Sequence, residues 1–233
     1  MRGNFVAPPF YCMNKISLFF SKPLPVVILV LLIDQISKIW IKTNMYLGQE
    51  FHVLGDWFII HFTENNGMAF GLELGGEIGK IILSVFRILA VIVIGYFVFR
   101  LPKEGAPKGL IICGALVLAG AIGNIIDSVF YGLIFNESYG QVATLFPAEG
   151  GYAPILQGRV VDMLYFPLIE GFFPEWVPFW GGEYFLFFRP VFNIADSAIS
   201  VGIFIIFIFH KRFFNKKKSS EETITENTDS INA

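Results

Sequence analysis

Three aspartates in the second half of the chain stand in apolar or amide-containing surroundings: Asp127, Asp162 and Asp196. Asn193 precedes Asp196 by three residues and Asn124 precedes Asp127 by three, so in a helix each pair shares one face. Two carboxyl groups close together in a low-dielectric site hold one proton between them, because both cannot ionise. The ionised member can take a proton from water while the protonated member polarises a peptide carbonyl. Spacing alone leaves open which two aspartates form such a pair.

The composition indicates that these residues belong to an integral membrane protein. Of the 233 residues, 55% are hydrophobic and 15% are charged, against about 25% charged in soluble domains. A carboxyl group inside a spanning segment costs at least ~2.5–3.5 kcal/mol by insertion scales, so Asp196 is expected to serve a function. Four segments approach the ~20 apolar residues that a helical span needs, at about 24–41, 78–99, 109–129 and 192–210.

Lysine and arginine in the flanks predict the orientation of these spans. The N-terminal segment, the connection after residue 99 and the C-terminal flank are basic, whereas the connections 42–77 and 130–190 are rich in acidic residues. Both termini are therefore expected in the cytoplasm and both larger connections outside. Residues 1–210 are interpreted as one membrane-embedded domain, and residues 211–233 as a basic, then acidic, disordered tail.

The two outer connections carry different signals. Short aromatic and β-branched runs flank Gly55-Asp56 and predict a hairpin at the membrane surface, within an outer β-cradle over about 50–70. The long loop 130–190 is rich in Phe, Trp, Gly and Pro, and its segments 172–176 and 185–188 are expected to be interfacial elements, because prolines interrupt a fifth span. The two cysteines and three histidines show no metal-ligand spacing, so neither a metal nor another cofactor is expected.

Five short motifs occur in one order across the predicted spans. They are Asp34-Gln35-x-Ser37-Lys38, Asn65-x-Gly67-x-Ala69-Phe70, Gly123-Asn124-x-x-Asp127, Val160-Val161-Asp162 and Phe192-Asn193-x-Ala195-Asp196-Ser197. Each motif is weak alone, but the ordered set resembles the lipoprotein signal peptidases (signal peptidase II), the membrane aspartyl peptidases of bacteria. The resemblance implies an all-α membrane body of four helices with a small outer β-cradle and an interfacial helix.

The resemblance also implies roles for individual residues. Asp162 and Asp196 would be the catalytic pair. Supporting or substrate-binding residues would be Asn193, Asn124, Asp127, Asn65, Gly67, Asp34 and Lys38, the last two as a structural pair. The implied reaction removes signal peptides from diacylglyceryl-modified prolipoproteins by cleavage before the lipidated cysteine. It would take place near the outer leaflet of the bacterial cytoplasmic (inner) membrane, in a monomer that contacts lipids, binds no nucleic acid and needs no cofactor.

The chain departs from the family pattern in two places. Ser128 stands where the family usually has arginine directly after the aspartate of the third motif, and Arg159 is the candidate to replace that guanidinium. The stretches 128–157 and 167–189 are longer than usual and are interpreted as an enlarged lid or interfacial platform.

The residues by themselves leave other interpretations open. Asp196 could simply cap the last helix, and Asn124 with Asp127 could be contacts between helices. A transporter or proton-relay subunit would use Asp34, Asp127 and Asp196 as intramembrane proton carriers. The polar residues gather towards the outer ends of the third and fourth predicted spans, with Asp34 as the exception, and this favours the peptidase.

Overall fold

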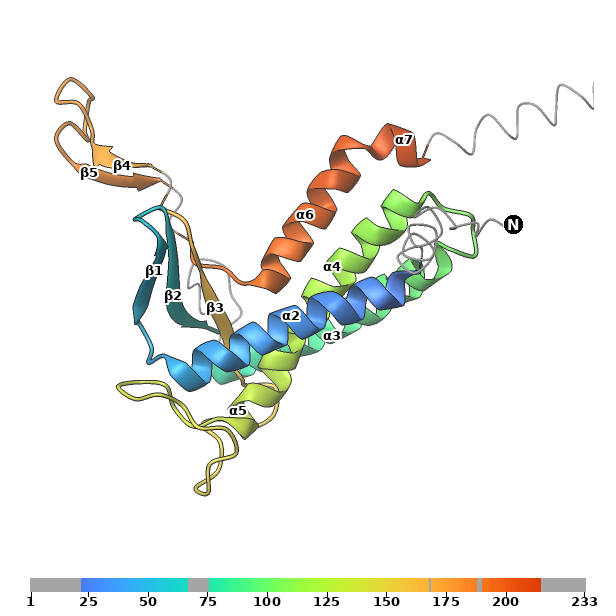
Figure 1. Cartoon of the computed structure of the whole chain (residues 1–233), viewed down its shortest axis with the longest axis horizontal. Coiled ribbons are helices and arrows are strands. Elements are labelled where there is room, and N and C mark those ends of the chain that lie inside the picture. The colour runs from blue at the N-terminus through green and yellow to red at the C-terminus, as the bar shows by residue number, and fades with distance from the viewer. Residues whose placement is uncertain (1–21, 67–75, 168, 188–189, 215–233) are drawn as a thin grey trace, which may run out of the picture.

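The fold, in a computed structural model that describes residues 22–66, 76–167, 169–187 and 190–214, is a bundle of apolar helices with a small antiparallel sheet at one end (Figure 1). The long helices are α2 (Pro23–Asn44), α3 (Gly76–Arg100), α4 (Lys108–Ile126) and α6 (Ile194–Ile208). Proline at the first position of α2 suits a helix start, because its missing N–H would have no partner there.

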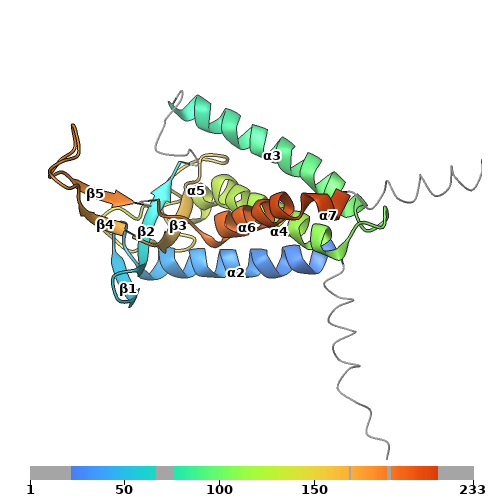
Figure 2. The same ribbon diagram turned by 90° about the horizontal axis from the view of Figure 1, so that it is seen from above.

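Helix α4 is the centre of the bundle and contacts α2, α3 and α6. Its glycines permit this close packing. A Cβ atom added at Gly120 would lie 2.2 Å from the carbonyl oxygen of Ala195, and one at Gly123 would lie 2.7 Å from Asp34 Oδ2. Helices α2 and α6 therefore meet α4 where the polar motifs lie. Figure 2 shows α3 meeting the bundle near its C-terminal end and diverging from it towards Gly76.

The predicted third span continues past residue 129. Helix α4 runs into a π-helical segment, Asp127–Tyr131, and then into α5 (Gly132–Ile134). Together they form one apolar helix from Lys108 to Ile134. Single π-helical turns inside α-helices are rare and occur frequently at functional sites.

The predicted hairpin at Gly55-Asp56 is confirmed. Strands β1 (Glu50–Leu54) and β2 (Phe58–Asn65) pair antiparallel, and β3 (Val160–Tyr165) pairs with the other edge of β2. Residues 67–70 of the predicted cradle lie outside the described residues. A buried cluster joins the sheet to α2 and to the extension of α4. Its members are Ile41, Met45, Phe62, Tyr131, Phe135, Ala143, Val161 and Met163.

The long outer loop contains a second, separate pair of strands, β4 (Ile169–Phe172) and β5 (Tyr184–Phe187). The interfacial elements predicted at 172–176 and 185–188 fall on this hairpin, and residue 188 lies outside the described residues. The described part of the chain contains no separate interfacial helix.

Three of the predicted spans are long and apolar enough to cross a membrane: Pro23–Asn44, Ile78–Arg100 and Lys108–Ile134. Helix α6 is apolar but has 15 residues, about 22 Å at 1.5 Å per residue. A fourth crossing and the position of the termini therefore stay predictions. The tail predicted to be disordered from residue 211 begins instead as helix α7 (His210–Phe214), in which the Phe213 ring lies 6.2 Å from that of Phe209.

Candidate active site

The site begins around Lys38, whose side chain on α2 is fully buried. Its Nζ lies 2.9 Å from Asp34 Oδ2 and 2.8 Å from Asp127 Oδ2. The same ammonium donates a hydrogen bond to Asn124 Oδ1 at 3.0 Å. A buried charge requires such partners, because an uncompensated one in a low dielectric is costly. The ion pair between Asp34 and Lys38 thus extends to Asp127 and connects α2 with α4.

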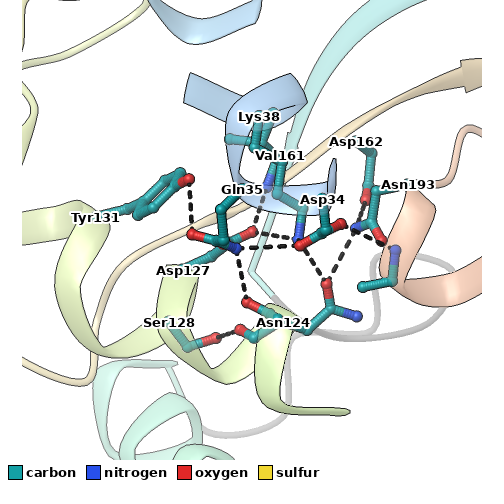
Figure 3. Close-up of polar contacts among 12 residues, drawn as sticks. Asp34, Gln35, Lys38, Asn124, Asp127, Ser128, Tyr131, Val161, Asp162 and Asn193 are labelled. Atoms are coloured by element: carbon teal, nitrogen blue, oxygen red, sulfur yellow. Dashed lines mark hydrogen bonds and ion pairs between the residues drawn. The ribbon is translucent and has the colours of Figure 1, made fainter. Parts of the chain in front are cut away.

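Two residues that were not predicted to belong to the site, Gln35 and Tyr131, add hydrogen bonds around Asp34 and Asp127. Gln35 Nε2 donates to Asp34 Oδ2 and to Asp127 Oδ1, both at 3.0 Å. The hydroxyl of Tyr131 donates to Gln35 Oε1 at 3.2 Å (Figure 3). Gln35 belongs to the first motif, so the sequence held a signal for it. Tyr131 had none, because it lies in an apolar segment after the third motif.

Asp162 and Asp196 are linked through two asparagines. Asn193 Nδ2 donates to Asp162 Oδ1 at 2.7 Å and to Asn124 Oδ1 at 3.1 Å. Asn124 Nδ2 in turn donates to Asp196 Oδ1 at 2.8 Å. Figure 3 shows Asp162 and Asn193 on one side of this group and Asp127 with Gln35 on the other. We call the whole group the aspartate cluster: Asp34, Lys38, Asn124, Asp127, Asp162, Asn193 and Asp196.

The start of α6 explains why Asn193 and Asp196 are held in place. Asn193 is the N-cap: its Oδ1 accepts a hydrogen bond from the Asp196 backbone N–H at 2.9 Å. The Asp196 carboxylate accepts one from the Asn193 backbone N–H at 3.4 Å, which completes a capping box. Asp34 Oδ1 accepts another free N–H of this first turn, from Ala195 at 2.9 Å. Asp196 is therefore a helix-capping residue and also a neighbour of Asp162, and the partial positive charge of the helix end favours its negative charge.

Asp162 lies on β3, opposite Thr63 of β2, and its side chain is 4% exposed. Asn65 Nδ2, also on β2, donates to Asp162 Oδ2 at 3.3 Å. Burial and then the nearby charge of Asp196 raise the pKa of Asp162 from 3.8 to about 7, against the opposing effect of the amide donors. At neutral pH this carboxyl is thus poised between its two protonation states.

A second group of charged residues lies beyond Lys38, around Glu64. Lys42 and Ser138 both contact Glu64 Oε1, and Lys42 donates to Ser138 Oγ at 2.8 Å. Burial by itself would raise the pKa of Glu64, but the charge of Lys42 and the hydrogen bonds from its neighbours hold it below the usual value. With Glu137 and Arg159 these residues form the glutamate cluster: Lys42, Glu64, Glu137, Ser138 and Arg159.

Arg159 belongs to this glutamate cluster and pairs with Glu64 and Glu137. Its two terminal nitrogens donate to the two carboxylate oxygens of Glu137 at 2.8 and 3.0 Å, and one of them also reaches Glu64 Oε2 at 3.0 Å. Such paired hydrogen bonds fix the guanidinium geometrically. The hydroxyl of Ser128 donates to the backbone carbonyl of Asn124 at 3.0 Å. The replacement expected at Arg159 is therefore wrong.

Arg87 on α3 is a cation that the sequence analysis did not assign to the site. It shares a helix face with Ser84, whose hydroxyl donates to the Leu156 carbonyl at 3.0 Å, and with Val91, which packs against the core. The charges of Arg87 and Asp196 attract each other. Ionisable residues inside a span usually face the protein interior and mark functional sites, so the signal was present in the sequence.

The remaining predicted residue, Gly67, lies outside the described residues. Within the described ranges, no three or more His, Cys, Asp or Glu side chains are grouped so that they could hold a metal ion. Cys113 is buried and unpaired by any disulfide.

Comparison with known proteins points to a single family. A family model described as signal peptidase (SPase) II matches residues 26–212. The chain is 52% identical over 206 residues to a lipoprotein signal peptidase of Porphyromonas gingivalis, covering 87% of this chain and 88% of the relative. It is 38% identical over 209 residues to a lipoprotein signal peptidase of Amoebophilus asiaticus, covering 88% and 84%. A solved bacterial membrane enzyme, 24% identical, superposes with a TM-score of 0.53 over 80% of this chain and 90% of that one, which supports the fold.

Proposed function

Because the chain belongs to the signal peptidase II family, we propose that it removes signal peptides from diacylglyceryl-modified prolipoproteins, cleaving before the lipidated cysteine with an aspartate dyad. Membership of this family makes the protein a membrane protease. The comparisons do not favour the alternative of a transporter or proton-relay subunit. The observation that carries the proposal is the chain of hydrogen bonds from Asp162 through Asn193 and Asn124 to Asp196, of which Asp162 and Asn193 are buried.

The surroundings of the two carboxyls support different roles for them. Asp196 lies at a helix N-terminus and its charge attracts that of Arg87, and both effects favour a negative charge at this position. Asp162 lies in a strand with amide partners, and its pKa of about 7 lets it keep a proton at neutral pH. In the proposed mechanism, Asp196 is therefore the general base and Asp162 the general acid.

Each proton in this mechanism has a defined path. Asp196 takes a proton from a water molecule as the water oxygen bonds to the carbonyl carbon of the scissile peptide. Asp162 gives its proton to the carbonyl oxygen, which forms a neutral tetrahedral intermediate. When the C–N bond breaks, the leaving amine takes the proton held by Asp196 and the hydroxyl proton returns to Asp162. Asn193 and Asn124 are proposed to hold the two carboxyls in register during these steps.

The proposal places the site near the outer leaflet of the bacterial inner membrane. Large apolar side chains are exposed along α2, α3 and α6, as lipid-facing helices require. The sheet that carries Asp162 lies at one end of the bundle, next to the start of α6 (Figure 1). With α6 as a fourth crossing and both termini in the cytoplasm, this end faces outward. The lipid chains of the substrate would then stay in the bilayer while its peptide reaches the sheet. Asn65 and Gly67 are proposed to line the peptide path, and the enzyme is proposed to act as a monomer.

Mass spectrometry of the products tests this function. The purified protein in lipid nanodiscs is incubated with a diacylglyceryl-modified prolipoprotein and, separately, with the same precursor lacking the lipid. We expect one cleavage, on the N-terminal side of the lipidated cysteine, and little cleavage of the unlipidated precursor. Cleavage at another bond, or equal cleavage of both precursors, would contradict the proposed specificity.

A further inference from the structure

The second hairpin presents an unusual surface. We call residues 169–187, which comprise β4, β5 and their connection, the aromatic hairpin. Four of its large side chains are mostly exposed: Phe172 at 71%, Trp176 at 81%, Phe179 at 95% and Trp180 at 57%. Water-exposed surfaces rarely gather so much apolar area at one place, and such patches usually mark an interaction site.

The connection between the strands is a compact platform. Its backbone is closed by hydrogen bonds from Phe173 N to Glu183 O and from Gly182 N to Phe173 O, both 2.9 Å. Phe179 has a φ of 70°, in the left-handed region that bulky residues rarely adopt. Backbone conformations of this kind persist only where the surrounding structure holds them, and they occur often at binding sites. The platform therefore holds the Phe179 ring outward in a defined position.

The charges around the hairpin restrict the kind of partner. The sequence has no lysine or arginine between residues 160 and 188, and it has glutamates at positions 170, 175 and 183. A surface without cations suits neither nucleic acid nor strongly anionic lipid. Tryptophan and phenylalanine beside proline, glycine and carboxylates suit the boundary between headgroups and acyl chains, where amphipathic rings are enriched.

The base of the hairpin lies where the apolar helices end. The rings of Phe166 and Phe192 stack with centroids 5.8 Å apart, and Phe192 precedes Asn193, the N-cap of α6. Phe166 also contacts Trp57, at 6.3 Å, in the turn between β1 and β2. Trp57 and Trp40, near the end of α2, are both more than half exposed at this end of the bundle. Figure 1 shows the hairpin extending sideways from here, across the direction of the helices.

We propose that the aromatic hairpin inserts its tip into the outer boundary of the same bilayer that the helices cross, with zwitterionic lipid as its partner. The lipid-facing surface of the helices and the exposed rings of Trp40 and Trp57 continue into this surface. Strand β3, which carries Asp162, ends at Tyr165, shortly before the hairpin begins at Ile169. Insertion therefore fixes the depth of β3 in the membrane relative to Asp196 on α6.

Tryptophan fluorescence tests the insertion directly. The chain has four tryptophans, so the double variant Trp40→Phe, Trp57→Phe retains reporters only in the hairpin. In nanodiscs of phosphatidylcholine with brominated acyl chains, we expect most of its emission to be lost, with little quenching by aqueous iodide. Strong quenching by iodide and none by the brominated lipid would overturn the proposal. If that variant folds poorly, the quenching of the wild type is compared with that of the double variant Trp176→Phe, Trp180→Phe. The difference between the two gives the quenching of the hairpin tryptophans.

A second measurement separates lipid from another copy of the chain as the partner. The triple variant Trp176→Ser, Phe179→Ser, Trp180→Ser is compared with Tyr139→Ser, Phe146→Ser, which removes exposed rings from an earlier part of the same outer loop, outside the hairpin. If lipid is the partner, chemical cross-linking between copies in nanodiscs is the same for both variants and the wild type. Cross-linking that only the triple variant abolishes, without quenching by brominated lipid, would overturn the proposal. Neither readout requires peptide cleavage, so both remain decisive if the proposed reaction is wrong.

Discussion

The aspartate cluster and the glutamate cluster are neighbours on the same face of α2, yet their charges are balanced differently. Asp34, Lys38 and Lys42 follow each other at intervals of four residues along this face. In the glutamate cluster, two cations contact two carboxylates. In the aspartate cluster, Lys38 forms ion pairs with Asp34 and Asp127, whereas the amides of Asn65, Asn124 and Asn193 donate hydrogen bonds to Asp162 and Asp196.

This difference explains which carboxyls are able to exchange protons. A cation in contact with a carboxylate stabilises its charge and lowers its pKa, as at Glu64. Amide donors provide weaker stabilisation, so burial and a neighbouring carboxylate prevail at Asp162 and raise its pKa to about 7. The carboxylates of the glutamate cluster are paired with cations and serve the framework of the fold. Asp162 accepts its side-chain hydrogen bonds from the amide groups of Asn65 and Asn193, and it can therefore carry a proton.

Replacing either Asp162 or Asp196 with asparagine should abolish cleavage, with kcat falling by at least ~10³-fold, because each carboxyl is proposed to transfer a proton. The matched change in the glutamate cluster, Glu137→Gln, should leave kcat within a few-fold of wild type. Asp56→Asn, at a side chain that is 94% exposed, controls for the loss of a carboxylate as such. Turnover is measured on a lipidated precursor in nanodiscs, and the melting temperature establishes that each variant is folded. Normal turnover of either dyad variant would refute the assignment.

Removing Lys38 should destabilise the protein more than removing Lys42. Lys38→Met leaves Asp34 and Asp127 buried without a cation, a change that costs about 3–5 kcal/mol at buried ion pairs. Lys42→Met leaves Glu64 in contact with Arg159 and Ser138, so its cost should be smaller. Thermal unfolding in detergent compares the two variants. An equal or larger loss for Lys42→Met would contradict the charge balance described above.

Asp162 and Glu64 should respond to pH in opposite directions. The pKa of Asp162 is raised in the folded state, so the folded protein binds the extra proton and stability falls as pH rises from about 4 towards 7. The pKa of Glu64 is lowered, so its contribution is present above the unfolded value and is lost as pH falls through the folded one. Melting temperatures measured from about pH 7 to below pH 4 should lose the first slope in Asp162→Asn and the second, at the acid end, in Glu64→Gln. Unchanged slopes would contradict the two assignments.

The same pKa predicts the alkaline limb of the activity profile. Because Asp162 must be protonated to act as the acid, kcat should fall as pH rises above about 7. Asn65→Ala removes a donor that lowers this pKa, so the limb should move to higher pH while the protein stays folded. A limb that remains in place would argue that another group controls it.

The smallest effect is expected at Arg159. Arg159→Lys removes the paired hydrogen bonds to Glu137 but keeps a positive charge at a side chain that is 31% exposed. The expected loss of stability is at most about 1 kcal/mol, with kcat unchanged. Arg100→Lys, which keeps an exposed pair with Glu104, serves as the reference in thermal unfolding. A marked fall in kcat would place Arg159 at the active site after all.

Local sequence was sufficient to predict the apolar helices, the hairpin at Gly55-Asp56 and the family. Apolar runs must become helices in a bilayer because every backbone polar group needs an internal partner there. A Gly-Asp turn between β-branched runs similarly forms a hairpin from local preferences. The residues of the aspartate cluster could also be predicted. Each belongs to a motif of a few consecutive residues, and such a motif can be recognised without knowing which distant residues it contacts.

Only the tertiary structure decided which of these residues meet. Asp34 reaches the backbone of Ala195, and Lys42 reaches Glu64 and Ser138, across separations that no periodicity encodes. Arg159 was assigned wrongly for the same reason, since a guanidinium suits any carboxylate and only packing chose Glu137 and Glu64. The sequence by itself determined the kinds of side chain that enter the membrane. The close approach of α4 to α2 and α6 determined that Asp34 and Asp127 pair with Lys38 and that Asp162 is held by amide groups.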